Sequence, residues 1–420
     1  MADKLLRHGG IIFSASVISF FFAYIFHFYM ARALGSESYG ILGSMLSLLY
    51  IFSVPGSVIT ITLAQIVAEQ GKENYGKIKS ILLISAKKLA YIGMIIFVIL
   101  IALSPLIKDM LNLPSVVPVI LLGFSLIFIT ILPSPRGVLQ GMQDFTNLGL
   151  NMAIDKPALL LFGAVFIYLG MGVNGAILSY GTAAFAVLML AFIPLKSTLA
   201  NHSEQVNLSV YKYASPIFIL ILGITVMSSI DILFVRRYFS GEVSGYFTAM
   251  KMMGMVIYFL AVAFGGVLLP KVSEMNTLNS AHGFLLRKAL AYFGIVLAGV
   301  LSAYALASGF IMTVLFGNGY SSISGYLVWY ALAMGMLSLA VIFMFYDVSA
   351  KRTAFRYPLI VFTLMQVALL AMFHESIDQI IGVQAGVFLA LLGSVVVIKR
   401  RYGGYGRAYA DKGIITGGLP

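Results

Sequence analysis

The chain has 420 residues, of which 60% are hydrophobic and only 10% are charged. A soluble domain carries about 25% charged residues, so this composition excludes a water-soluble globule and requires lipid as the main solvent. The absence of cysteine excludes disulfides, thiolate metal sites and cysteine nucleophiles. We attribute the formal net charge of +12 to cytoplasmic loops of a membrane protein, and not to nucleic-acid binding.

Apolar runs of membrane-spanning length recur along the whole chain. Backbone groups in hydrocarbon must pair within their own segment, so each run predicts a transmembrane helix and the fold class is an all-α integral membrane protein. The first run is too long for the apolar region of a signal peptide, so it is interpreted as an uncleaved span. The twelve predicted spans are 10–31, 40–68, 89–107, 116–135, 148–170, 173–195, 213–235, 244–270, 289–316, 323–346, 357–373 and 379–398.

Lysine and arginine are unevenly distributed between alternate loops. With a cytoplasmic N-terminus, 22 of the 27 basic residues fall on the inside and one, Lys251, lies within a span. The four on the outside are Arg32, Lys108, Arg236 and Arg237. Because basic loops stay in the cytoplasm, the pattern predicts a multi-pass protein of the cell (cytoplasmic) membrane with both termini inside.

The two halves of the sequence contain related segments. Three residues of the first half recur 205 positions later: Arg32, Glu37 and Gly40 correspond to Arg237, Glu242 and Gly245. Six spans per copy preserve the orientation, so we expect lobes at 1–205 and 206–401 related by a pseudo-twofold axis along the membrane normal. Residues 402–420 are rich in glycine and poor in apolar side chains, which predicts a flexible cytoplasmic tail.

Several segments resemble a known family. Residues 31–40, ARALGSESYG, and the apolar span that follows them are similar to the first helical hairpin of polysaccharide-biosynthesis flippases, and 139–145, 229–231 and 241–246 match further motifs. These oligosaccharide flippases belong to the multidrug/oligosaccharidyl-lipid/polysaccharide (MOP) exporter superfamily. The resemblance covers nearly the whole chain. It implies export of polyprenyl-diphosphate-linked oligosaccharide by alternating access, for surface polysaccharide or glycan assembly.

Ionisable side chains within spans are costly and are therefore the first functional candidates. Asp231 lies in the outer part of the seventh predicted span, and Lys251 lies at a comparable depth in the eighth. Two interpretations remain open. The two residues form a cavity site for an anionic headgroup or a coupling ion, or they form a structural ion pair that joins the two helices.

Three further candidates lie toward the outer ends of the spans. His27 either binds phosphate or titrates with a proton gradient, or it is a hydrogen-bonded packing residue. Arg32 and Arg237 are equivalent in the repeat. They either pass an anionic diphosphate outward or anchor helix ends through lipid phosphates or nearby glutamates, and the structural role is favoured.

The cytoplasmic ends of the spans supply the remaining candidates. A mouth that captures diphosphate needs basic side chains, and Arg136 is the strongest of these because its helix approaches the lobe interface in the family architecture. The alternative is that such charges only set topology and contact anionic lipid. Asp144, Asp155 and Lys156 are candidates for a salt-bridged cytoplasmic gate.

Three functions remain open. We prefer the flippase, because bases outnumber acids among the intramembrane candidates and a cationic cleft suits an anionic cargo. A MATE-like cation-coupled multidrug exporter predicts an acidic cleft, and a membrane-embedded oligosaccharide polymerase predicts a long outer loop. No catalytic or metal-binding motif is found, so we expect no enzyme activity and no cofactor beyond H⁺ or Na⁺ as a coupling ion. Expected partners are membrane lipid and the lipid-linked oligosaccharide, with glycan-assembly enzymes as further candidates.

Overall fold

The computed structural model describes residues 2–71, 74–206, 211–277, 282–350 and 352–403, and every regular element in these ranges is helical. From residue 404 onward, the tail predicted at 402–420 lies outside the described residues. The helices are α1 (Ala2–Gln70), α2 (Tyr75–Met110), α3 (Val117–Ile131), α4 (Pro133–Gly141), α5 (Phe145–Tyr168), α6 (Gly172–Phe192), α7 (Lys196–Ala200), α8 (Tyr211–Tyr238), α9 (Gly241–Thr277), α10 (Gly283–Phe316), the 3₁₀ helix η1 (Asn318–Tyr326), α11 (Leu327–Ser349), α12 (Arg356–Met372) and α13 (Ile377–Gly403).

The helices account for all twelve predicted spans. Within the described residues, ten helical segments are long and apolar enough to cross a membrane, and α12 is a shorter apolar helix. The first of the ten is α1, whose backbone leaves helical geometry at Gly35 (φ 74°, ψ 169°), so α1 contains two spans. Counting α1 twice and adding α12 gives twelve, which confirms the all-α multi-pass membrane fold.

Several helix boundaries differ from the apolar runs, among them the starts of α2 and α10. Helices α2 and α10 begin at Tyr75 and Gly283, whereas the corresponding runs begin near residues 89 and 289. The first turns of α2 carry lysines and are too polar to be predicted as part of a transmembrane span. They are helical in the structure, where Asn74 caps the helix by accepting a hydrogen bond from the Lys77 amide (3.4 Å). Apolarity therefore located the membrane part of these helices and missed their polar extensions.

The chain divides into two compact units. Unit 1 comprises Met1–Met252 with Gly309–Ser324, and unit 2 comprises Met253–Ser308 with Gly325–Pro420. Helix α10 passes from one unit to the other close to Ala307, where its backbone leaves helical geometry (φ −136°, ψ 23°). The lobes predicted at 1–205 and 206–401 rest on the sequence repeat and stay a prediction.

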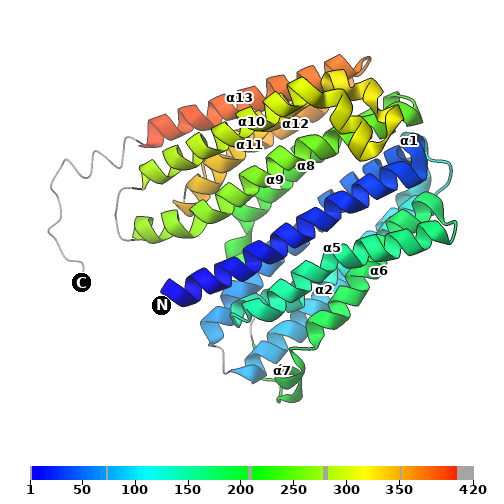
Figure 1. The fold of residues 1–420 in the computed structure, drawn as a ribbon. Coiled ribbons are helices and arrows are strands. Elements are labelled where there is room, and N and C mark those ends of the chain that lie inside the picture. Colours follow the sequence, from blue (N-terminus) through cyan, green and yellow to red (C-terminus); the bar gives the residue numbers. More distant parts are fainter. Residues whose placement is uncertain (1, 72–73, 207–210, 278–281, 351, 404–420) are drawn as a thin grey trace. The chain divides into compact units, whose positions relative to one another are not determined.

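Unit 1 is built around α1, which packs along α5, α4 and α8. Figure 1 shows α1 beside α5. Helix α2 packs on α3, and α3 packs on α6. A buried aliphatic cluster joins α1, α2, α4 and α5, and it contains Leu63, Val67, Ile78, Ile81, Leu82, Val138, Leu139, Leu148 and Leu195. On the outside of the bundle, apolar side chains such as Ile95 and Leu161 are 58% and 62% exposed. A surface of this kind is stable in lipid and would aggregate in water.

Helices α1 and α9 meet within unit 1 at equivalent positions of the repeat. A Cβ added at Gly40 would lie 2.8 Å from the backbone nitrogen of Gly245, and one added at Gly245 would collide with the Ser36 carbonyl. A Cβ at Gly43 would collide with Thr248, which is again 205 positions away. The glycines therefore permit the two backbones to touch. Two of these contacts join residues 205 positions apart, as a local twofold relation between the two copies requires.

Candidate functional site

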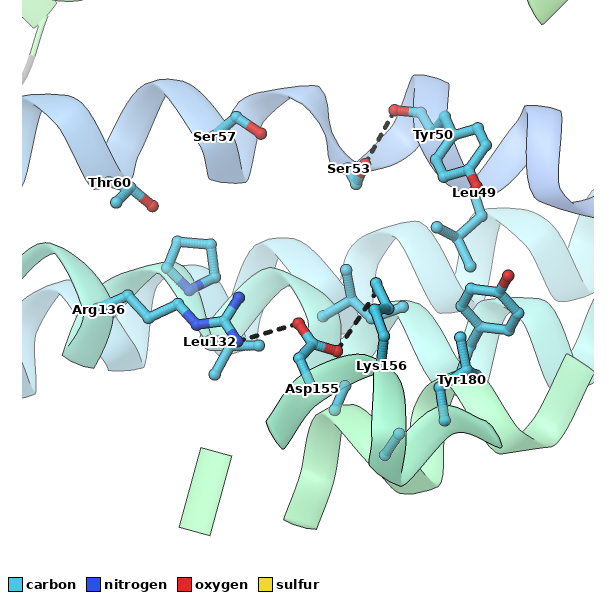
Figure 2. Close-up of a pocket in the computed structure, with 15 residues that line it drawn as sticks. Leu49, Tyr50, Ser53, Ser57, Thr60, Leu132, Arg136, Asp155, Lys156 and Tyr180 are labelled. Atoms are coloured by element: carbon cyan, nitrogen blue, oxygen red, sulfur yellow. Dashed lines mark hydrogen bonds and ion pairs between the residues drawn. The ribbon is translucent and has the colours of Figure 1, made fainter. Parts of the chain in front are cut away.

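A cavity of about 320 Å³ lies inside unit 1, enclosed by α1, α3, α4, α5 and α6 (Figure 2). Its wall combines charged, hydroxyl and aromatic side chains with aliphatic ones. The residues that line it are Leu49, Tyr50, Ser53, Ser57, Thr60, Ile129, Leu132, Pro133, Arg136, Asp155, Lys156, Leu159, Tyr180, Ala183 and Ala184. Most ligand sites have this character, with an apolar wall and a few convergent polar groups.

Three charged side chains meet on the cavity wall. The Asp155 carboxylate contacts two cations, with Oδ2 3.0 Å from Arg136 Nη2 and Oδ1 3.4 Å from Lys156 Nζ (Figure 2). The three side chains are 19% (Arg136), 18% (Asp155) and 31% (Lys156) exposed, so they remain accessible from the cavity. Two bases and one acid give this trio a formal charge of +1.

The local fold explains why these side chains converge. Pro133 stands in the first turn of α4, where its missing N–H is tolerated, and it starts a short helix that carries Arg136 toward α5. Asn151 and Asp155 are four residues apart on α5, so they share one face of that helix. Lys156 follows Asp155 directly, and its ammonium lies 5.9 Å from the centre of the Tyr180 ring on α6.

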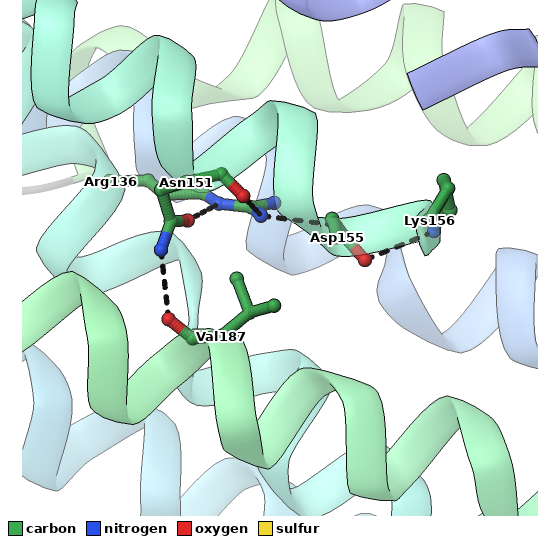
Figure 3. A network of polar contacts seen from close by, with 5 residues as sticks. All are labelled: Arg136, Asn151, Asp155, Lys156 and Val187. Atoms are coloured by element: carbon green, nitrogen blue, oxygen red, sulfur yellow. Dashed lines mark hydrogen bonds and ion pairs between the residues drawn. The ribbon is translucent and has the colours of Figure 1, made fainter. Parts of the chain in front are cut away.

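Asn151 fixes the orientation of Arg136 (Figure 3). Arg136 Nε donates to Asn151 Oδ1 at 2.8 Å, while Asn151 Nδ2 donates to the Val187 carbonyl of α6 at 2.8 Å. Asn151 is 5% exposed, so both bonds are shielded from water. The guanidinium is thereby held by α5 and α6 together, independently of its contact with Asp155.

Hydroxyl groups and aromatic rings face the same cavity. Ser53 and Thr60 satisfy their hydroxyl protons on α1, at the carbonyls of Tyr50 (2.9 Å) and Gly56 (3.2 Å), and their oxygens remain acceptors. Tyr50 and Tyr180 add phenol groups to the wall. Guanidinium and ammonium groups are the usual partners of phosphate oxygens, and hydroxyl and phenol groups suit the hydroxyls of a sugar. The arrangement can therefore bind a phosphorylated, hydroxyl-rich ligand.

Asp231 and Lys251 form the ion pair that their depths allowed. Lys251 Nζ lies 2.6 Å from Asp231 Oδ1, and the two side chains are 4% and 0% exposed. Neither residue lines the cavity. The geometry is that of the structural alternative, a buried pair that joins α8 to α9.

His27 is a buried packing residue in this structure. Its Nδ1 lies 3.2 Å from the Tyr39 hydroxyl, and its ring stands edge-on to Phe26. Phe26 in turn packs edge-on against Tyr180, whose other side faces the cavity. His27 therefore supports the cavity wall from behind and does not line it.

Arg32 and Arg237 bind the ends of other helices. Arg237 Nη1 donates to the Asp109 carbonyl at the end of α2 (2.9 Å), and Arg32 donates to the Val314 carbonyl near the end of α10. Arg32 and Arg237 are 205 positions apart, and so are Asp109 and Val314. Each arginine places a positive charge at a helix C-terminus, where the helix dipole is negative. These contacts match the structural role favoured for the two arginines.

The three proposed gate residues are not all together. Asp144 caps the N-terminus of α5, accepting from the Asn147 amide at 3.2 Å and from its side chain at 2.7 Å. Asp155 and Lys156 lie on the cavity wall, where Arg136 joins them. The salt-bridged group therefore consists of Arg136, Asp155 and Lys156, and Asp144 is not part of it.

Sequence reasoning missed four residues of these sites. Asn151, Tyr50 and Tyr180 are uncharged and gave no polar signal within their spans. Arg236 was counted only as an outer loop charge, yet it is 3% exposed and donates to the carbonyls of Leu111 (3.0 Å) and Asn112 (2.8 Å). The four-residue spacing from Asn151 to Asp155 was the one available signal, since it places both on one face of a helix.

Unit 2 has a separate polar cluster near the end of α11. The Lys399 ammonium lies 5.0 Å and 4.7 Å from the ring centres of Phe343 and Tyr346, and the Tyr346 hydroxyl lies 2.9 Å from His282 Nδ1. Burial and the positive charges of Arg352 and Lys399 lower the pKa of His282. Asp347 is buried, and within the described residues its Oδ1 has no hydrogen-bond partner.

A family model and a membrane protein of known sequence each match more than half of the chain. Residues 5–276 match the family model described as "Polysaccharide biosynthesis protein". The uncharacterized membrane protein MJ1375 of Methanocaldococcus jannaschii is 24% identical, over 75% of this chain and 85% of its own length.

Solved structures share the fold at low identity. One is an inward-facing multidrug resistance MATE family transporter of the MOP superfamily, with 14% identity, a TM-score of 0.76 and coverage of 93% of this chain and 95% of that one. Another is a MOP superfamily transporter from Pyrococcus furiosus, for which reverse polarity of the binding pocket suggests a different function. It has 15% identity, a TM-score of 0.67 and coverage of 96% of both chains.

Proposed function

Because this chain belongs to the polysaccharide biosynthesis protein family, we propose that it is a flippase. Its cargo is a polyprenyl-diphosphate-linked oligosaccharide, which it moves across the cell membrane by alternating access. The observation that carries this proposal is the pair of cations, Arg136 and Lys156, on the wall of a cavity that also presents hydroxyl and phenol groups. We also propose that both termini lie in the cytoplasm, because the distribution of basic residues favours that orientation.

The chemistry of the cargo explains what the protein must supply. A polyprenyl tail can stay in the bilayer, but a sugar-diphosphate head cannot enter hydrocarbon, because burying each unpaired polar group costs about 2–7 kcal/mol and burying a charge costs far more. A cavity with fixed cations replaces the water around the phosphates. Arg136 is well suited to this task, since Asn151 holds its guanidinium in place before a ligand arrives.

A MATE-like exporter of cationic compounds is the second candidate. It is supported by the likeness to the multidrug resistance MATE structure and by the presence of Asp155 on the cavity wall. Asp155 already contacts two bases, so the trio carries a net positive charge and repels a cation. The cavity charge therefore favours the anionic cargo.

The test is transport in proteoliposomes. We expect wild-type protein to flip a fluorescent polyprenyl-diphosphate-linked sugar, and expect Arg136→Gln with Lys156→Gln to reduce the rate at least tenfold. Lys87→Gln is the matched control, because Lys87 is an exposed base of α2 that does not line the cavity. Transport of cationic dyes without flipping of the anionic lipid would overturn the proposal in favour of the exporter.

A further inference from the structure

Asp155 is the single acid among the residues that line the described cavity, and it occupies the space between both cations. Each carboxylate oxygen contacts a different base, Oδ2 with Arg136 at 3.0 Å and Oδ1 with Lys156 at 3.4 Å. A phosphate group bridging these bases would use its oxygens in the same way. The carboxylate thus stands where an anionic ligand would bind.

We infer that Asp155 is an internal competitor of the anionic ligand, which lowers the affinity of the cavity for diphosphate and thereby speeds release. This inference rests on the proposed flippase function. A transporter gains nothing from binding its cargo tightly, because energy gained equally in all bound states slows release without speeding the step that moves the cargo. A tethered carboxylate acts at high effective concentration and is always available to take the bases back.

The surroundings of Arg136, Asp155 and Lys156 indicate that Asp155 competes with the ligand and does not merely hold Arg136 in place. Asn151 already anchors Arg136 to α5 and, through the Val187 carbonyl, connects it to α6. Arg136 therefore keeps its place when the carboxylate leaves. The side chains are also reachable, with 18–31% exposure, whereas the bracing pair Asp231–Lys251 is at most 4% exposed. A displaced Asp155 can remain facing the cavity, where its charge repels the bound phosphates.

Asp155→Asn provides the test, because it removes the charge and keeps the size and hydrogen-bonding capacity of the side chain. The probe is a synthetic farnesyl diphosphate carrying N-acetylglucosamine, measured by equilibrium binding to purified protein and by flipping in proteoliposomes. We expect Asp155→Asn to bind the probe at least tenfold more tightly and to turn over at least threefold more slowly, so that KM and kcat fall together. Asp109→Asn, at an exposed carboxylate that does not line the cavity, is the matched control and should leave both values unchanged.

A merely structural Asp155 gives a different result. Its loss would lower the melting temperature without tightening binding of the probe. An affinity that is unchanged or weaker in Asp155→Asn overturns the inference. Asp155→Ala is the second variant and carries the same expectation, and failure of both variants to fold would also overturn it. If wild-type protein does not bind the probe, or Arg136→Gln binds it equally well, then the proposed function fails and the inference falls with it.

Discussion

Unit 1 contains two sets of ion-paired side chains that differ in their exposure. On the cavity wall, Asp155 is shared by Arg136 and Lys156 at 3.0 and 3.4 Å, with side chains 18–31% exposed. Between α8 and α9, Asp231 meets Lys251 at 2.6 Å, with side chains at most 4% exposed. Under the proposed function, access to the cavity, and not the presence of charge in a span, distinguishes the ligand site from the structural brace.

Breaking the buried pair should give the largest effect on stability. Asp231→Asn leaves the Lys251 ammonium buried without its counter-ion, and such a change costs about 3–5 kcal/mol. We expect a sharp fall in the yield of monodisperse protein and in its melting temperature. Replacing both residues, as Asp231→Leu with Lys251→Met, should recover most of the loss. Full stability of Asp231→Asn alone would show that the pair is not a brace.

The crossing of α1 and α9 should be the next most sensitive place. At Gly245 an added methyl group collides with the Ser36 carbonyl, and overpacking of this kind costs about 1–3 kcal/mol. Gly245→Ala should therefore lower the melting temperature measurably. Gly266→Ala in the same helix is the control, because nothing lies within 4 Å of its added Cβ. Equal melting temperatures for the two variants would contradict the close crossing.

Mutation of the cavity trio should affect ligand affinity more than stability, whereas mutation of the buried Asp231–Lys251 pair should affect stability most. Arg136→Lys keeps the charge but loses the fork that Asn151 orients, so we expect roughly tenfold weaker binding of a diphosphate-linked lipid. Arg136→Lys also removes the shielded bond to Asn151 Oδ1, and leaving a buried acceptor without its donor costs about 1–3 kcal/mol, which is less than the loss expected for Asp231→Asn. Paired binding and melting measurements check both values. A large loss of stability with unchanged affinity would make the trio a second brace.

The arginines at the helix ends should give the smallest effects. Arg237→Gln removes one exposed contact with the Asp109 carbonyl, and a charge at a helix terminus contributes about 0.3–1 kcal/mol. We expect a small decrease in melting temperature and no change in ligand affinity. Arg32→Gln should behave in the same way, because it is the repeat equivalent of Arg237. A large loss of affinity in either variant would support a direct role in passing the diphosphate outward.

The sequence was most informative where hydrocarbon imposes a rule. Each span had to be a helix with internal hydrogen bonds, so all twelve were found. The 205-residue offset identified Arg32 with Arg237 and Gly40 with Gly245, and the structure shows equivalent contacts for both pairs. Helix rise alone placed Asp231 and Lys251 at one depth.

The cavity itself could not be derived in this way. Its wall depends on which faces of α1, α4, α5 and α6 turn toward one another, and that is decided by packing. In the sequence, Tyr50, Tyr180 and Asn151 look like other polar residues of the spans. Only the packing of neighbouring helices brings them to the cavity or to Arg136. The predicted span from 116 to 135 is one apolar helical segment, Val117–Gly141, that also contains Arg136, so its cytoplasmic end lay further along the chain than the apolar run indicated.

On the proposed function, the diphosphate head binds in the unit 1 cavity beside Arg136 and Lys156. Photo-crosslinking tests it most directly, using a polyprenyl-diphosphate-linked sugar with the reactive group on the first sugar and mapping the adducts by mass spectrometry. We expect adducts on cavity residues of α1 and α6, such as Tyr50 and Tyr180, that excess unlabelled lipid diphosphate prevents. Adducts confined to residues outside the cavity, or unchanged in the Arg136→Gln, Lys156→Gln double variant, would contradict the account.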